Sequence, residues 1–299
     1  MQDILKSNTP AFVFDTAALK KRVAQIKEIV GETVSLCYSM KANPFFVPAM
    51  ITCVDKLEVC SPGELTICKK LGVDASRIIY SGVNKEIPDI KEAYEYGVGT
   101  FTAESVRQAD LIQQVVETAA AGEKAEVILR LNSGSQFGMS KEDLLTILQC
   151  RESKYTSLNF TGIHYFVGTQ RKRAKRKIKE LQMLLELFEE IQNKYGLKLK
   201  KLEYGPGFAV PYFEDDDFED TLYPVKELKD TLKQVAQQVD LTIEMGRFFT
   251  AECGTYYTNV ADLKTVGNAH YCILDGGMNH LTYLGQMMGM KTPIIKHHK

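Results

Sequence analysis

A lysine stands at the point where a short, mostly apolar strand is expected to end. The strand covers residues 35–40, and the Asn43-Pro44 pair downstream of Lys41 must leave extended structure. At the mouth of an apolar fold the amine is desolvated, which we expect to lower its pKa and make it nucleophilic. Such a lysine forms a Schiff base with an aldehyde. The alternative is that Lys41 extends into solvent, as strand-end lysines usually do.

Glycine-containing segments follow two later strand candidates and could bind a phosphate group. Gly205-Pro206-Gly207 follows one strand, and its glycines allow close approach and donation from backbone N–H groups. Gly168 and Thr169 follow another strand and add a hydroxyl group. The alternative for the first segment is a Gly-Pro turn without function.

Charged and aromatic residues at two strand ends could complete a cofactor site. Glu244 could pair with a protonated ring nitrogen, and Arg247 could bind phosphate, or the two could form a structural ion pair. His164 and Phe166 share one face of an earlier strand because alternate residues point the same way. His164 could also be a core residue whose hydrogen bonds are satisfied.

Eight strand candidates alternate with amphipathic helix candidates. This alternation is typical of βαβ units in a parallel sheet, and eight units over about 220 residues favour a closed (β/α)8 barrel. An open doubly wound sheet should carry Gly-x-Gly-x-x-Gly after its first strand, where Lys41-Ala42-Asn43-Pro44 stands instead. The strand candidates are residues 35–40, 57–60, 78–81, 99–102, 125–131, 160–167, 201–204 and 241–245. The helix candidates are residues 62–71, 85–96, 104–119, 141–150, 172–195 and 225–239.

The chemically interesting residues all fall where such a barrel places its active site, at the C-terminal ends of the strands. The residues at these ends are Lys41, Ser61, Ser81, Gly82, Arg130, Asn132, Gly168, Thr169, Gly205, Gly207, Glu244 and Arg247. The agreement between position and chemistry supports the barrel more strongly than any one motif does.

The two ends of the chain do not fit the barrel. Residues 9–15 resemble a short strand that leads into a helix over residues 16–30. Residues 248–261 and 271–274 resemble further strands. A second, β-rich domain built from both ends of the chain is therefore expected.

We expect the barrel domain to cover residues 16–250. The second domain would comprise residues 1–15 and 251–299. Residues 287–299 end without a turn or cap, so this domain is expected to be truncated at its C-terminal end.

The composition is that of a globular protein, with 44% hydrophobic and 25% charged residues and a net charge of −1. This charge gives no general attraction to nucleic acid or membranes. The seven cysteines are odd in number and form no Cys-x-x-Cys pair, so we expect no disulfide framework, no metal site and a reducing cytoplasm. No apolar run approaches the roughly 18 residues of a membrane span, and no signal peptide is expected.

Two runs of like charge stand out. Residues 171–179 carry seven basic residues in nine, and residues 214–220 carry six acidic residues in seven. Both runs could be solvated faces. The basic run follows Gly168 and Thr169 directly, so it could also dock an acidic protein beside the active site. Aromatic residues are not interleaved with the basic ones, so DNA or RNA binding is not expected.

Together, these motifs resemble the pyridoxal-phosphate-dependent amino-acid decarboxylases of the alanine-racemase-like (fold type III) group, which includes diaminopimelate and ornithine decarboxylases. The resemblance covers nearly the whole chain, in order and spacing. The matching motifs are Tyr38-Ser-Met-Lys41-Ala-Asn43, Val59-Cys-Ser61-Pro-Gly63-Glu64-Leu65, Ser81-Gly82-Val-Asn84-Lys85, His164-Tyr-Phe166-Val-Gly168-Thr169-Gln170, Gly205-Pro-Gly207-Phe208, Glu244-Met-Gly246-Arg247 and Asp275-Gly-Gly277-Met-Asn279.

The resemblance implies a role for each candidate. Lys41 would form the Schiff base with pyridoxal 5'-phosphate, and Glu244 would keep the pyridine nitrogen protonated so that the ring accepts electrons. His164 would join these two as a catalytic residue, and no metal is implied. The cofactor phosphate would be bound by Gly168, Thr169, Gly205, Gly207 and Arg247. Arg130 would approach the phenolic oxygen of the ring, Phe166 would stack on the ring face, and Asp275 would contact the substrate.

This chain departs from the family pattern at several points. Phe166 replaces a ring-stacking histidine and supplies no charge, and Pro206 replaces a phosphate-loop glycine and has no N–H to donate. Residues 280–285 replace an Arg-Pro pair that helps diaminopimelate decarboxylases bind the substrate carboxylate. The amino-acid sequence of residues 205–208 and 275–280 is closer to that of family members that act on aminoacyl groups tethered to carrier proteins. The family's Cys-x-x-x-Asp proton donor and its phosphate-binding tyrosine would fall beyond residue 299.

We therefore expect a pyridoxal-phosphate-dependent α-decarboxylase of an amino acid that acts as a homodimer, with turnover impaired if the Cys-x-x-x-Asp segment is missing. One alternative is a decarboxylase of a carrier-protein-tethered aminoacyl group. A second is a non-catalytic homologue that binds the cofactor or a partner, against which intact Lys41, Glu244 and Arg247 argue. A third is an amino-acid racemase, which would need a second acid or base opposite Lys41.

Overall fold

The computed structural model describes residues 8–119, 123–216, 218–283, 286 and 290–297. Of the C-terminal stretch that was predicted to be truncated, residues 287–289 and 298–299 lie outside the described residues. Residue 217 of the acidic run also lies outside them.

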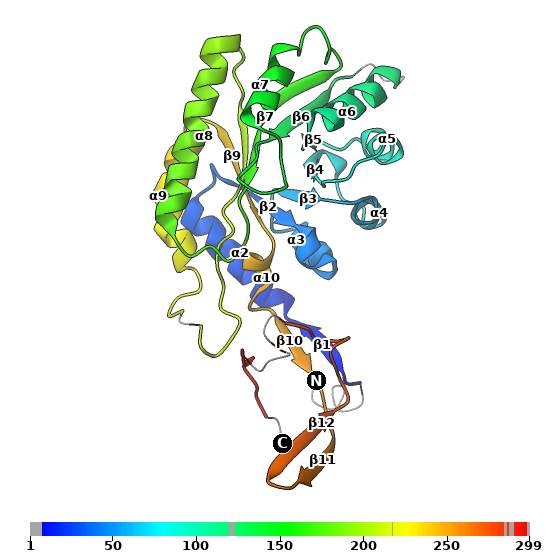
Figure 1. Ribbon diagram of the computed structural model, residues 1–299, viewed down its shortest axis with the longest axis vertical. Helices are drawn as coiled ribbons and strands as arrows, with labels where there is room; N and C mark the ends of the chain where they lie inside the picture. Colours follow the sequence, from blue (N-terminus) through cyan, green and yellow to red (C-terminus); the bar gives the residue numbers. More distant parts are fainter. Residues whose placement is uncertain (1–7, 120–122, 217, 284–285, 287–289, 298–299) are drawn as a thin grey trace. The chain divides into compact units, whose positions relative to one another are not determined.

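Eight parallel strands close into a barrel in sequence order, and the last strand pairs with the first through Ile243 and Leu36 (Figure 1). This confirms the predicted (β/α)8 barrel. The strands are β2 (Ser35–Ser39), β3 (Lys56–Val59), β4 (Ile78–Tyr80), β5 (Thr100–Ala103), β6 (Ala125–Arg130), β7 (Leu158–Phe166), β8 (Lys201–Gly205) and β9 (Asp240–Met245).

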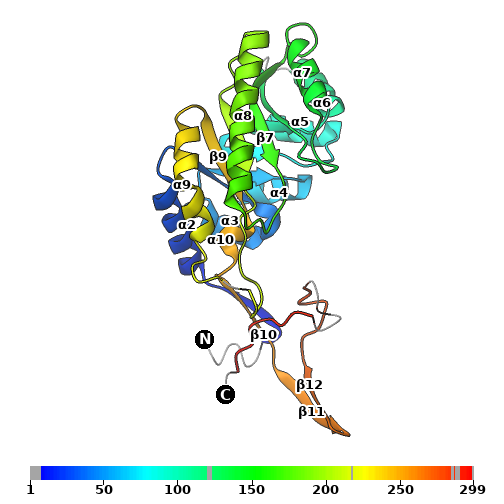
Figure 2. The same cartoon turned by 60° about the vertical axis from the view of Figure 1, so that its left-hand side comes forward.

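Helices surround the barrel, and α8 and α9 pack side by side on its outer surface (Figure 2). The α-helices are α2 (Thr16–Val30), α3 (Val47–Met50), α4 (Pro62–Lys70), α5 (Ile87–Tyr96), α6 (Val106–Thr118), α7 (Lys141–Gln149), α8 (Ala174–Tyr195), α9 (Tyr223–Ala236) and α10 (Arg247–Thr250). Short 3-10 helices are η1 (Met40–Ala42), η2 (Pro44–Phe46) and η3 (Ala75–Arg77). Over the described ranges, no helix combines the length and apolar character that a membrane crossing requires.

Serine caps start the helices that follow β3, β5 and β6. The hydroxyls of Ser61, Ser105 and Ser140 each accept a hydrogen bond from the backbone N–H three residues later, at 3.0–3.2 Å. These bonds satisfy N–H groups that a helix start leaves without partners. The caps therefore fix where each chain segment turns from strand to helix, at the barrel end that carries the candidate residues.

One layer of the barrel interior is apolar. Cys37, Ile79 and Ile128 contact one another there and are at most 3% exposed. They come from the alternate strands β2, β4 and β6, which is the layering typical of this fold. The polar residues described below depart from this apolar filling.

The chain divides into two compact units. One comprises Lys20–Ala209 and Leu222–Phe249, and the other comprises Met1–Leu19, Val210–Thr221 and Thr250–Lys299. The first unit contains the barrel. The domain limits that were proposed from the sequence, 16–250 and 1–15 plus 251–299, stay a prediction.

The second unit contains two antiparallel strand pairs, which confirms its predicted β-rich character. Strand β1 (Ala11–Phe14) pairs with β10 (Gly254–Tyr257), and β11 (Val260–Val266) pairs with β12 (Ala269–Leu274).

The continuous strand predicted over residues 248–261 is wrong. Phe248 and Phe249 lie in helix α10, where both rings are buried and the carbonyl of Phe248 accepts a 2.7 Å hydrogen bond from Arg22. The remaining stretch is interrupted between β10 and β11. There the Asp275 carboxylate accepts hydrogen bonds from the Thr258 hydroxyl at 2.7 Å and the Asn259 N–H at 2.9 Å, and these hold both residues outside the ladder.

Candidate active site

Lys41 lies at the C-terminal end of β2, as predicted. The strand ends at Ser39, and the 3-10 helix η1 carries Lys41. Asn43 fixes the turn, since its side chain accepts a hydrogen bond from the Phe45 N–H at 3.0 Å and its carbonyl accepts one from the Tyr38 hydroxyl at 2.7 Å. The Lys41 amine is thereby held at the barrel mouth, with 46% of the side chain exposed.

The predicted fall in the pKa of Lys41 is wrong. Partial burial lowers this pKa, but two carboxylates more than offset it: Glu244 and Glu58 raise the pKa well above its ordinary value. The amine nitrogen lies 2.8 Å from Glu58 and 3.3 Å from Glu244. In the cofactor-free protein Lys41 is therefore an ammonium group, held in place by two buried acids.

Glu244 is a buried carboxylate with both oxygens fixed. Oε1 accepts hydrogen bonds from the Ser39 hydroxyl at 2.8 Å and from Lys41, and Oε2 lies 3.0 Å from His164 Nε2. Burial raises the pKa of Glu244, but Lys41 and His164 outweigh it and hold the pKa well below its ordinary range. Within the described residues its ion pairs are with Lys41 and His164, so the suggested pairing with Arg247 is not found.

His164 and Glu203 face each other across β7 and β8 inside the barrel. They are paired in register and are at most 2% exposed. Neither His164 Nδ1 nor either Glu203 oxygen has a hydrogen-bond partner among the residues that the structure describes. Burial lowers the pKa of His164, but the hydrogen bond with Glu244 and the charge of Glu203 raise it above the ordinary value. Glu203 was not predicted; the signal was an acidic residue in the middle of an apolar strand.

The buried Glu203 should make the stability of the cofactor-free protein depend on pH. Burial raises its pKa to about 7, against the attraction of His164. Since the same group titrates near pH 4.3 in an unfolded chain, the folded state binds one more proton between about pH 4.3 and pH 7. This stabilising contribution is complete below that window and is lost as pH rises through about 7, with an upper limit of about 4 kcal/mol.

Replacing Glu203→Gln should therefore flatten the fall in the unfolding midpoint Tm between about pH 5 and pH 7. Glu126→Gln is the control, because Glu126 lies at the start of β6 and pairs with Lys201. An unchanged pH slope in the Glu203 variant would mean that Glu203 is ionised throughout.

Glu58 and Cys60 are two further residues of this cluster that sequence reasoning missed. Glu58 is 2% exposed and ion-pairs with Lys41. The Cys60 thiol donates to Glu58 at 3.3 Å and lies 3.7 Å from the Lys41 amine. Alternation along the strand could have found them, since Glu58 and Cys60 point the same way, toward the barrel interior.

The proposed phosphate residues gather at the ends of β7, β8 and β9. Arg247 lies 3.5 Å from the Thr169 hydroxyl. Gly207 has φ +59° and its backbone passes so close to Gly168 that a Cβ atom there would lie 1.8 Å from the Gly168 carbonyl oxygen. At Gly168 itself, with φ +131°, a Cβ atom would meet no atom within 4 Å. The Gly168 backbone therefore borders open space where a ligand can approach.

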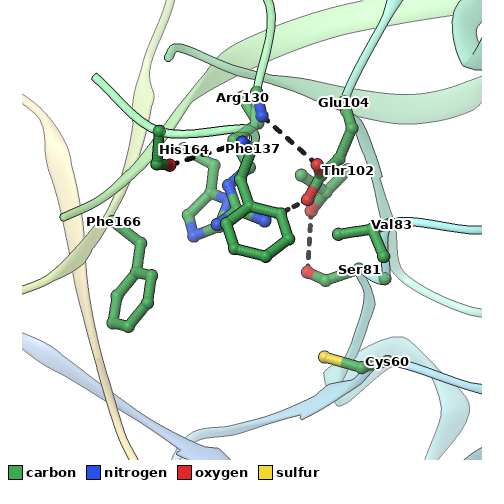
Figure 3. Close-up of polar contacts among 12 residues, drawn as sticks. Cys60, Ser81, Val83, Thr102, Glu104, Arg130, Phe137, His164 and Phe166 are labelled. Carbon is green, nitrogen blue, oxygen red and sulfur yellow. Dashed lines mark hydrogen bonds and ion pairs between the residues drawn. The ribbon is translucent and has the colours of Figure 1, made fainter. Parts of the chain in front are cut away.

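Arg130 at the end of β6 forms a buried ion pair with Glu104, as Figure 3 shows. Its guanidinium lies 5.3 Å from the Phe137 ring centroid and 6.0 Å from that of Phe166. The Phe166 centroid lies 5.7 Å from the Lys41 amine. Phe166 therefore lies between the positive groups at the barrel mouth, where it can cover one face of a flat ring.

Asp275 belongs to the second unit. Its carboxylate accepts hydrogen bonds from the Thr9 hydroxyl at 2.5 Å, the Thr258 hydroxyl and the Asn259 N–H. The predicted role in substrate binding stays a prediction.

The donor set fits pyridoxal phosphate. The Lys41 amine can bind the aldehyde of the cofactor. The Glu244 carboxylate, for the ring nitrogen, and the Phe166 ring, for the ring face, both lie within 6 Å of this amine. Glycines, a hydroxyl and an arginine for its phosphate lie at the neighbouring strand ends.

Comparison with known proteins gives one consistent family. Residues 16–251 match the family described as pyridoxal-dependent decarboxylase, pyridoxal binding domain. The chain is 27% identical to the L-glutamyl-(BtrI acyl-carrier protein) decarboxylase of Niallia circulans, over 96% of this chain and 72% of that protein. It is 27% identical to the diaminopimelate decarboxylase of Aquifex aeolicus, over 91% of this chain and 67% of that protein.

The fold is similar to that of solved decarboxylases. A lysine decarboxylase from Selenomonas ruminantium superimposes with a TM-score of 0.79 at 25% identity, over 93% of this chain and 74% of that one. These similarities favour neither a racemase nor a non-catalytic homologue. The family match covers most of the chain, and the chain belongs to the pyridoxal-dependent decarboxylases, carboxy-lyases whose cofactor is pyridoxal phosphate.

Proposed function

We propose that Lys41 carries the cofactor of this amino-acid α-decarboxylase and that Glu244 controls the protonation of its ring. The observation that supports this most directly is the 3.3 Å contact between Lys41 Nζ and Glu244 Oε1, at the ends of the neighbouring strands β2 and β9. When bound, pyridoxal phosphate accepts the electron pair that the departing carboxylate leaves on the α-carbon.

The side chains around this pair divide the remaining tasks. Glu244, ionised and fixed by Ser39 and His164, would keep the ring nitrogen protonated. Glu58, which lies 2.8 Å from the Lys41 nitrogen, would hold the amine whenever it is free. Phe166 would cover one face of the ring and exclude water from it.

We assign the phosphate to the backbone of Gly168, Gly205 and Gly207 with Thr169 and Arg247. Backbone N–H groups and an arginine are the donors that phosphate oxygens prefer. Pro206 has no N–H, and its carbonyl accepts a 3.4 Å hydrogen bond from Arg171, which supports the loop instead.

We also propose that the protein is a homodimer in the cytoplasm. Exposed apolar side chains on β11 and β12, such as Leu263 at 72% and Val266 at 62%, support an interface with a second copy. No disulfide joins any two of the cysteines that the structure describes, which suits a reducing compartment.

The assignment of Lys41 predicts a single site of cofactor attachment. Protein incubated with pyridoxal phosphate should turn yellow, and borohydride reduction should fix a pyridoxyl group on Lys41, as read by peptide mass mapping. Lys85 is an internal control, because it too follows a barrel strand, but it is 3% exposed and its amine donates to the Gly82 and Thr102 carbonyls. Label on Lys85, or on no lysine with cofactor in excess, would refute the assignment.

We keep one second candidate function, the decarboxylation of an aminoacyl group tethered to a carrier protein. It is favoured by the similarity to the carrier-protein decarboxylase of Niallia circulans over 96% of this chain. The test is to supply free diaminopimelate, ornithine, lysine and glutamate, and then glutamate loaded on the BtrI acyl-carrier protein. Efficient use of a free acid and none of the loaded carrier would exclude this candidate.

A further inference from the structure

The basic run at the start of α8 separates into inward and outward residues. Arg171 ion-pairs with Glu180, and Lys177 is buried and donates to the carbonyls of Arg171 and Arg173. These two residues are therefore structural. The other five are exposed and are called here the basic surface: Lys172, Arg173, Lys175, Arg176 and Lys179.

The described contacts of the fold give no structural reason for four cations of the basic surface, Arg173, Lys175, Arg176 and Lys179. Within the described part of the chain, no acidic side chain forms an ion pair with Arg173, Lys175, Arg176 or Lys179. The first turn of α8 contains no acidic residue, and Arg173 provides no side-chain cap. Cations at a helix start oppose the helix dipole, so these residues weaken α8 rather than stabilise it. Their positive potential is, however, favourable for an anionic partner.

The basic surface is attached to the candidate phosphate site. The Arg171 N–H donates to the Gly207 carbonyl at 2.8 Å, and Lys177 holds the Arg171 carbonyl at 2.7 Å. The surface begins at Lys172, three positions after Thr169, so the Cα atoms of these two residues lie within about 11 Å of each other. In Figure 2 the start of α8 lies at the same end of the barrel as α10, which follows β9.

We infer that the basic surface docks an acidic carrier protein, which presents to Lys41 an amino acid linked as a thioester through its side-chain carboxyl, so that the α-carboxylate stays free to leave as CO2. This rests on the second candidate function above. A free amino acid needs no protein-sized contact beside the barrel mouth, whereas a carrier protein must be held there while its aminoacyl group reaches the site. Exposed charges of this kind act chiefly on the rate of encounter and are screened by salt.

The test compares two substrates with the same reacting group. Glutamate is loaded on the BtrI acyl-carrier protein through its γ-carboxyl, and the γ-glutamyl thioester of a small thiol serves as the carrier-free substrate. The variant is the triple charge reversal Arg173→Glu, Lys175→Glu and Arg176→Glu, which leaves Arg171 and Lys177 intact. The control reverses the same number of charges at the other end of the helix, at Lys194 in its last turn and at Lys198 and Lys200 just beyond it.

For the carrier-linked substrate, we expect the triple variant to lower kcat/KM by roughly 10- to 100-fold at low salt, with the loss shrinking as salt is added. The small thioester should be used within about twofold of wild type, and the control should behave like wild type on both substrates. Fluorescence anisotropy of labelled BtrI should show the same loss of binding for the triple variant, without any need for turnover.

Two outcomes would overturn the inference, and they are distinguishable. If wild type and triple variant have equal kcat/KM on loaded BtrI and equal anisotropy with labelled BtrI, the basic surface is excluded as the docking site. The proposal of a carrier-linked substrate is not affected by that result. A wild-type enzyme that decarboxylates free amino acids and ignores loaded BtrI would remove both the carrier substrate and the docking surface.

Discussion

Replacing Lys41→Arg is expected to reduce turnover by roughly 10³-fold or more while leaving the fold intact. A guanidinium keeps the positive charge that Glu58 and Glu244 hold in the cofactor-free protein. It stays protonated and cannot form a covalent bond with the cofactor's aldehyde. The measurement is kcat with saturating cofactor, together with the absorbance of the bound cofactor.

Lys41→Ala separates the chemical role from the electrostatic one. Alanine removes the same nucleophile and also removes the cation that contacts both Glu58 and Glu244, so we expect a lower Tm than for Lys41→Arg at equal loss of turnover. Lys56→Arg is the matched control, because Lys56 begins the barrel strand β3 and its amine donates to the Thr242 hydroxyl. A Lys41→Arg variant within about tenfold of wild-type kcat would contradict the assignment.

The positions of the candidate residues could be predicted because the fold decides them. Once eight strands alternate with helices, every strand ends on the same face of the barrel, so Lys41, Gly168 and Glu244 had to lie near one another. Local patterns sufficed for this, since the strand periodicity and the serine caps are short-range signals.

The charges around those residues could not be predicted in the same way. The pKa of Lys41 depends on Glu58 and Glu244, which lie 17 and 203 residues away in sequence. An isolated lysine at a barrel mouth would have a lowered pKa; one placed between two buried acids has a raised one. The same applies to Arg171, which looked like one more surface cation until its pairing with Glu180 placed it in the structural part of the basic run.

Glu244→Gln is expected to bind the cofactor yet lower kcat by roughly 10²- to 10⁴-fold. The amide has nearly the shape of the carboxylate and can still contact Ser39, but it has no negative charge with which to hold a proton on the ring nitrogen. An unprotonated ring is a poor electron acceptor, so the loss should appear in kcat and hardly in cofactor affinity.

A second readout of Glu244→Gln follows from His164, whose ring nitrogen lies 3.0 Å from the carboxylate. Glu244 and Glu203 raise the pKa of this buried imidazole, so its contribution to stability is present at low pH and is lost as pH rises through that raised value. Removing the Glu244 charge should lower the pKa of His164, which NMR titration of the imidazole can measure, and Glu126→Gln should leave both kcat and this pKa unchanged. Unaltered turnover in Glu244→Gln, with the His164 pKa shifted as expected, would show that the carboxylate organises the barrel interior without acting on the cofactor ring.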